Sequence, residues 1–191
     1  MGVPGLPQSA TGQTSILAGV NAPAAVGRHI NGYCTKSLAA LLDGRSLFSR
    51  VLAAGGKATF ANAYTPRYLE KPPRFLSVST VATLRAGLRL RTLDDLARGE
   101  ALFHDYTNRL LPERGYIVPA ITPREAGEPL ARLAHTHSFT ISPVITATSR
   151  ISLPAGTPGI RCQPFFGGLV PPRRQPELEA SPTSLLLSCG I

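Results

Sequence analysis

Ser9 is the residue whose surroundings best suit chemistry in this sequence. It lies in the stretch Pro-Gln-Ser-Ala-Thr-Gly-Gln-Thr at 7–14, which leads into small and apolar residues typical of a helix. A hydroxyl at a helix start lies beside unpaired backbone N–H groups and the positive end of the helix dipole, and both favour an incoming phosphate. Gly12 allows the backbone to approach a ligand closely. The same Ser-x-x-Gly spacing is typical of an ordinary helix cap, so these residues alone leave both interpretations open.

The residues around this turn favour a nucleophile turn over an ordinary helix cap, because they resemble those of a known family. The stretch 2–14, with Gly-Val-Asn-Ala-Pro at 19–23 and Gly-Arg-His at 27–29, resembles a metalloenzyme branch of the alkaline phosphatase superfamily. The turn is similar to the Asn-Ser-x-x-Gly-His turn of cofactor-independent phosphoglycerate mutases, although Gln13 stands where the mutases carry His. The resemblance covers about residues 3–140. It implies that Ser9 is the metal-bound nucleophile and that Asn21 and Arg28 orient the substrate anion.

A second polar group lies at 101–108. His104, Asp105 and Asn108 fall within one turn of a predicted helix, and the four-residue spacing places His104 and Asn108 on one face. A similar sequence in the same metalloenzyme branch implies that the three residues line the substrate pocket, with Arg109 or Arg114 holding a phosphate. A polar helix face packed on the core is the alternative. The His-x-His pair at 135–137 is typical of a surface rather than of a metal site.

The metal ligands that the resemblance implies are largely missing. Intact relatives bind two divalent ions (Mn, Zn or Mg) through an Asp upstream of the nucleophile and further Asp and His residues downstream. Here only eight residues precede Ser9, the four Asp residues are at 43, 94, 95 and 105, and the last His is at 137. Two such ions need a larger set of carboxylates and imidazoles. We expect that the chain as given is truncated, holds no metal stably and has little or no catalytic activity.

The composition changes after residue 140. The last 51 residues contain eight prolines and no Asp, His or Lys, which excludes a long helix or central strand. Codons for 139–149, read in another frame, permit the missing Asp-x-x-Gly-His. We therefore expect 137–191 to be a Pro-rich tail that is non-native or disordered, arising from a frameshift or an unrelated sequence.

The remaining sequence predicts an α/β fold. Apolar spacing predicts helices at 15–26, 37–42 and 46–54, a glycine turn and a strand at 57–64, an order that favours a parallel sheet. Prolines at 66, 72 and 73 mark a boundary, and further helices are predicted at 78–88, 92–98, 102–111 and 123–135. Thr92 and Thr122, with acids in the following turn, are expected to be structural helix caps. The interpretation is a partial alkaline-phosphatase-like core with the nucleophile turn at 1–66 and a mostly helical cap insertion at 67–136.

Charge and cysteine content narrow the function classes. The net charge of +9 suits a phosphorylated or sulfated small-molecule substrate, whereas scattered Arg residues without dense runs argue against a nucleic-acid binder. Three cysteines without C-x-x-C spacing, no apolar run of about 18 residues and no leader pattern predict a cytoplasmic protein away from membranes. The oligomeric state stays open.

The sequence therefore predicts a metal-dependent phosphoryl-transfer enzyme or a phosphate or sulfate ester hydrolase, truncated and inactive as given. A non-catalytic pseudoenzyme or binding fragment is the alternative. A basic nucleic-acid-binding protein is a third class, and steep salt dependence of binding would identify it.

Overall fold

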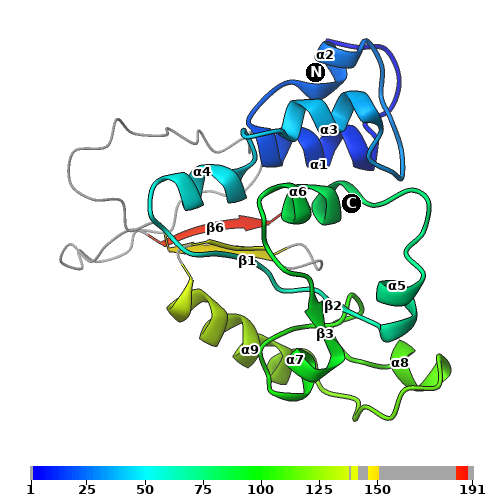
Figure 1. The fold of residues 1–191 in the computed structure, drawn as a ribbon, viewed down its shortest axis with the longest axis vertical. Helices are drawn as coiled ribbons and strands as arrows, with labels where there is room; N and C mark the ends of the chain where they lie inside the picture. Colours follow the sequence, from blue (N-terminus) through cyan, green and yellow to red (C-terminus); the bar gives the residue numbers. More distant parts are fainter. Residues whose placement is uncertain (1, 138, 142–145, 151–183, 189–191) are drawn as a thin grey trace, which may run out of the picture.

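Helices and strands alternate along the chain in the computed structural model, which describes residues 2–137, 139–141, 146–150 and 184–188 (Figure 1). The coarse α/β expectation is confirmed. The described helices are α1 (Ser9–Ala18), α2 (Ala22–Val26), α3 (Lys36–Leu42), α4 (Leu47–Ala53), α5 (Pro66–Glu70), α6 (Val78–Arg85), α7 (Leu93–Ala97), α8 (Leu110–Glu113) and α9 (Pro123–Thr136). The described strands are β1 (Ala58–Phe60), β2 (Ala63–Tyr64), β3 (Arg91–Thr92), β4 (Phe139–Ile141), β5 (Thr146–Arg150) and β6 (Ser184–Ser188).

The strands form two sheets. The larger has the order β1-β4-β5-β6, in which β1 and β4 are parallel with Ala58 opposite Phe139, while β4, β5 and β6 are antiparallel. The smaller pairs β2 with β3 in parallel, with Ala63 opposite Arg91. The predicted strand 57–64 is thus two strands, because Asn62 leaves the first sheet to form a bridge with Leu102. The parallel pairing expected after the helix and glycine turn is present in both sheets.

Helices cover both faces of the larger sheet. α4 and α6 contact β1 from one side, and α9 contacts β4 and β5 from the other (Figure 1). α1, α2 and α3 pack together next to α6, so the first helices of the chain join the layer above the sheet. Leu38, Leu42 and Phe48 are fully buried in this layer and form a cluster with Phe60 of β1. This core holds the start of α1 and the strand β1 in fixed positions.

Local capping determines where most described helices begin. Six of them start with a hydroxyl side chain that accepts a hydrogen bond from the first turn: Thr35, Ser46, Thr65, Ser77, Thr92 and Thr122. At Thr92 and Thr122 the third helical residue, Asp95 or Glu125, bonds back to the cap. The predicted structural role of these two sites is confirmed.

Two helix predictions are wrong: one helix starts earlier and divides, and the other does not form. The helix predicted at 15–26 starts at Ser9 and divides at Gly19, whose φ of 67° ends α1 before Asn21 caps α2. The helix predicted at 102–111 does not form. The chain there turns through Tyr106 and Asn108, with φ values of 46° and 61°, and only Leu110–Glu113 is helical.

The division into a core at 1–66 and a cap insertion at 67–136 stays a prediction. α6, from the range predicted as a cap, contacts α1 and α3 of the predicted core and contributes Val78 and Ala82 to the same hydrophobic cluster. Within the predicted tail 137–191, the described segments form β4, β5 and β6, and the rest of the tail lies outside the described residues. Its non-native origin stays a prediction. None of the helices in the described ranges has the length and apolar character needed to cross a membrane.

Candidate functional site

Ser9 is the first residue of α1, and its side chain is exposed. Its hydroxyl donates a hydrogen bond to Asn31 Oδ1 at 2.8 Å and accepts one from the Gly32 backbone N–H at 3.1 Å. Both partners belong to the loop that follows α2. The loop therefore fixes the direction of the hydroxyl while leaving one side of the residue open to a ligand.

The same loop occupies backbone donors at the start of α1. The N–H groups of Ala10 and Thr11 both donate to the Ile30 carbonyl, at 3.1 and 3.2 Å, and the N–H of Gly12 donates to Gln8. Thr11 Oγ1 accepts in return from the Ile30 N–H at 3.3 Å. An anion beside Ser9 would meet these donors only after the Ile30 carbonyl had moved.

Asn21 and Arg28, the predicted anion-orienting residues, are not hydrogen-bond partners of Ser9. The side chain of Asn21 accepts from the Ala24 N–H at 3.3 Å and so caps α2. Arg28 is exposed on the loop after α2. Asn21 has a local structural role, and Arg28 stays available to an anion in solvent.

Asp105 and Asn108 hold the turn that replaces the predicted helix. Asp105 accepts from the Asn108 N–H at 3.0 Å and from the Leu110 N–H at 2.9 Å, and Asn108 Nδ2 donates to the Pro119 carbonyl at 3.2 Å. Asn108 is 3% exposed. These two side chains bind backbone rather than face a substrate cavity, so the expected common face of His104 and Asn108 is absent.

His104 lies apart from that turn network and packs beside Phe103, with ring centroids 4.2 Å apart. Partial burial, followed by the positive charge of Arg114, lowers the pKa of His104 below its ordinary value, while Asp105 raises it. The Arg114 guanidinium itself lies 5.6 Å from the Phe103 ring centroid. Burial and the Arg114 charge thus both favour the neutral form of the imidazole.

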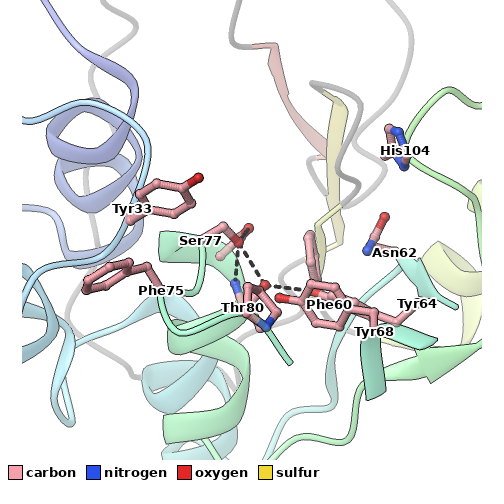
Figure 2. Close-up of a pocket in the computed structure, with 11 residues that line it drawn as sticks. Tyr33, Phe60, Asn62, Tyr64, Tyr68, Phe75, Ser77, Thr80 and His104 are labelled. Atoms are coloured by element: carbon pink, nitrogen blue, oxygen red, sulfur yellow. Dashed lines mark hydrogen bonds between the residues drawn. The ribbon is translucent and has the colours of Figure 1, made fainter. Parts of the chain in front are cut away.

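His104 lines a hollow of about 300 Å³ (Figure 2). Its aromatic wall comes from distant parts of the chain: Tyr33, Phe60, Tyr64, Tyr68 and Phe75. Its polar side chains are Asn62, Ser77, Ser79, Thr80 and His104. Of the residues predicted for the site, only His104 lines this hollow. Ser9, Asn21, Arg28, Asp105 and Asn108 do not.

The aromatic wall was missed in the sequence. Phe60, Tyr64 and Tyr68 recur at intervals of four, and Tyr33 and Phe75 flank them at a distance in the chain. Such spacing is also typical of a buried core, and Phe60 and Tyr64 do belong to the core cluster. The signal was present but did not distinguish a pocket wall from ordinary packing.

Among the described residues, no group of three or more His, Cys, Asp and Glu side chains could hold a metal ion. The hydrogen-bond partners of Ser9 are an amide oxygen and a backbone N–H. These groups do not fit the carboxylate and imidazole donor set that two divalent ions need.

Comparison of the chain with protein-family models, curated proteins and solved structures finds no match.

Proposed function

We propose that this chain carries the nucleophile turn of a phosphoryl-transfer enzyme or phosphate or sulfate ester hydrolase of the alkaline phosphatase and phosphoglycerate mutase type. The observation that supports this proposal is the exposed Ser9 hydroxyl on the first residue of α1, directed by Asn31 and Gly32. An exposed hydroxyl held in one direction can approach a phosphorus atom, although it needs activation to attack it. In the resembled enzymes, two divalent ions (Mn, Zn or Mg) supply the activation.

The proposed covalent step transfers the phosphoryl group from the ester to Ser9. Ser9 Oγ forms a bond to phosphorus, the bond from phosphorus to the ester oxygen breaks, and the leaving oxygen keeps the electron pair. The hydroxyl proton passes to water, because neither hydrogen-bond partner of Ser9 is a base. Turnover then requires water to attack the phosphorus of phosphorylated Ser9, which breaks the Oγ–P bond, returns a proton to the serine oxygen and releases phosphate. A hydroxyl at its ordinary pKa is a weak nucleophile, so we expect the first step, and with it turnover by this chain, to be very slow.

The test uses p-nitrophenyl phosphate and p-nitrophenyl sulfate with added Mn²⁺, Zn²⁺ or Mg²⁺. Release of p-nitrophenol gives turnover, and peptide mass spectrometry detects phosphate or sulfate on Ser9 without requiring turnover. Ser9→Ala should abolish both signals. Ser37→Ala is the matched control, because Ser37 is also an exposed serine in the first turn of a helix, and its hydroxyl lies 3.0 Å from that of the cap Thr35. Equal product formation by Ser9→Ala and the unaltered chain would overturn the proposal.

A non-catalytic binding fragment is the second candidate. The observation that favours it is the pairing of the Ala10 and Thr11 N–H groups with the Ile30 carbonyl, which leaves fewer donors for an anion at the helix start. This candidate predicts neither p-nitrophenol release nor a modified Ser9 under any of the three metals.

A further inference from the structure

The hollow beside β1 presents aromatic rings to solvent. Tyr33 and Phe75 form a tilted pair with ring centroids 5.9 Å apart, and their residues are 57% and 55% exposed. Figure 2 shows this pair on one side of the hollow, with Phe60, Tyr64 and Tyr68 on another. Phe60 and Tyr64 are buried, so Tyr33 and Phe75 are the rings of this hollow that are exposed to a ligand. An exposed aromatic pair favours a flat ligand that stacks on it.

Four hydroxyl groups run along the wall between the aromatic groups. Ser77 Oγ contacts Ser79 Oγ at 3.1 Å and Thr80 Oγ1 at 2.7 Å, and Thr80 Oγ1 contacts the Tyr64 hydroxyl at 2.7 Å (Figure 2). Each hydroxyl carries one proton, so four hydroxyls joined by three hydrogen bonds leave one proton outside the chain. A ligand can accept this proton where it lies on Ser77 or Ser79, which are half-buried, whereas Thr80 and Tyr64 are buried.

Asn62 also lines the hollow, near His104 in Figure 2. Its Oδ1 is buried without a hydrogen-bond partner in the part of the chain described, and it has almost no accessible surface. A ligand in the hollow would therefore reach this oxygen only after neighbouring atoms had moved.

The charges around the hollow define the ligand further. Among the described residues that line it there is no carboxylate, lysine or arginine, and His104 is the one imidazole in that set. Immediately outside, the Arg74 guanidinium lies 5.3 Å from the Phe75 ring centroid. An uncharged ring inside and an anionic group at the rim would fit this distribution.

We propose that this hollow binds a nucleoside monophosphate, with the base between the Tyr33–Phe75 pair and the hydroxyl wall and the phosphate beside Arg74. A base supplies the flat face for Tyr33 and Phe75 and an acceptor for the spare hydroxyl proton. A free sugar offers hydroxyls but neither a planar face for Tyr33 and Phe75 nor an anion for Arg74. The inference does not depend on Ser9 chemistry and goes beyond the proposed ester transfer.

Isothermal titration calorimetry with AMP, GMP, CMP and UMP, without metal, tests the inference. We expect saturable binding of at least one mononucleotide and a loss of at least about tenfold in affinity for the double variant Tyr33→Ala/Phe75→Ala, since base stacking on aromatic side chains typically contributes that much. Both residues are exposed, so the variant should fold, and circular dichroism checks this. Tyr106→Ala is the matched control, because Tyr106 is 39% exposed and lies outside the hollow.

Two further titrations separate the parts of the inference. Arg74→Ala should weaken AMP binding and leave adenosine binding unchanged, because adenosine has no phosphate. Ser9→Ala should leave AMP binding unchanged. A loss of nucleotide binding can therefore be told apart from a failure of the ester-transfer proposal. Absence of binding for all four mononucleotides would overturn the inference. So would equal affinity in the double variant, tighter binding of methyl glucoside than of AMP, or binding of a single-stranded oligonucleotide without binding of any mononucleotide.

Discussion

Arg91 of β3 donates a hydrogen bond from its Nε to Thr59 Oγ1 of β1 at 2.9 Å, and this bond connects the two sheets. Both residues are buried, with 7% and 6% exposure. Burial lowers the pKa of the Arg91 guanidinium, with a smaller contribution from Arg89, whereas Asp95 and Glu100 raise it. Arginine nevertheless stays charged at neutral pH, so the hydrogen bond to Thr59 compensates part of the cost of burying a cation.

Thr59→Val should therefore destabilise the protein. It preserves the shape of the side chain but removes the acceptor for Arg91, and an unpaired buried donor costs about 1–3 kcal/mol. Urea unfolding followed by circular dichroism measures the change. Thr136→Val, at an exposed helix end, is the control and should lower the free energy of unfolding by less than about 0.5 kcal/mol. Equal midpoints for the two variants would contradict the role assigned to the Arg91–Thr59 bond.

Asp95→Asn should weaken the start of α7. The Asp95 side chain is 1% exposed and accepts from Arg89 at 2.6 and 2.8 Å, from Arg98 at 2.5 Å and from the Thr92 N–H at 2.8 Å. Because charged hydrogen bonds are lost, we expect a decrease of about 2–3 kcal/mol in the free energy of unfolding. Asp94→Asn, an exposed acid in the same turn, is the matched control and should change it much less.

The pH dependence of stability provides a second measurement on Asp95. The Arg89 hydrogen bond, and then the Thr92 backbone, hold the pKa of this carboxyl well below its ordinary 3.8 despite burial. The folded pKa is therefore below the unfolded one, and the stabilisation is complete above about pH 4 and is lost as the pH falls toward the folded value. Asp95→Asn should reduce this loss in acid, while Asp94→Asn should retain it. If Asp95→Asn lost stability in acid to the same extent as the unaltered chain, the ion pairs of Asp95 would not be the source of that loss.

Tyr64→Phe tests the burial of the Tyr64 hydroxyl through the ionisation of tyrosine at high pH. Burial raises the pKa of Tyr64 to about 12, although hydrogen bonds from Thr80 and Asn62 lower it. The folded state therefore keeps a proton that the unfolded state releases near its ordinary pKa of 10, so stability falls as the pH rises from about 10 to about 12. Absorbance of tyrosinate should contain a late ionisation step, and Tyr64→Phe should remove that step. A titration of Tyr64→Phe that still contains the late step would assign it to another tyrosine.

Features determined by neighbouring residues were predictable from the sequence. Thr92 with Asp95, and Thr122 with Glu125, form capping boxes as expected, because every group involved lies within four residues of the others. The predicted helix at 102–111 does not form, and the reason is also local, although the apolar spacing did not indicate it. Asp105 accepts hydrogen bonds from the Asn108 and Leu110 N–H groups and so competes with helical hydrogen bonding.

Features determined by distant residues were not predictable. The strand 57–64 divides because Ala61 and Ala63 bond to Leu102, about forty residues later in the chain. Ser9 was correctly placed near a helix start, but its partners Asn31 and Gly32 come from a loop beyond α2. The hollow likewise needs Tyr33, Asn62, Phe75 and His104, which no single sequence pattern connects.

The Ile30 carbonyl also affects the order in which the N-terminal region can fold. Gln8 provides no side-chain cap for α1, and the first-turn N–H groups of Ala10 and Thr11 depend on a carbonyl about twenty residues later. A ten-residue helix is marginal by itself. During synthesis, α1 therefore gains this support only after residue 30 has emerged and the intervening loop has closed. The directed Ser9 hydroxyl forms in the same step, so a nascent chain shorter than this carries the serine without its orientation.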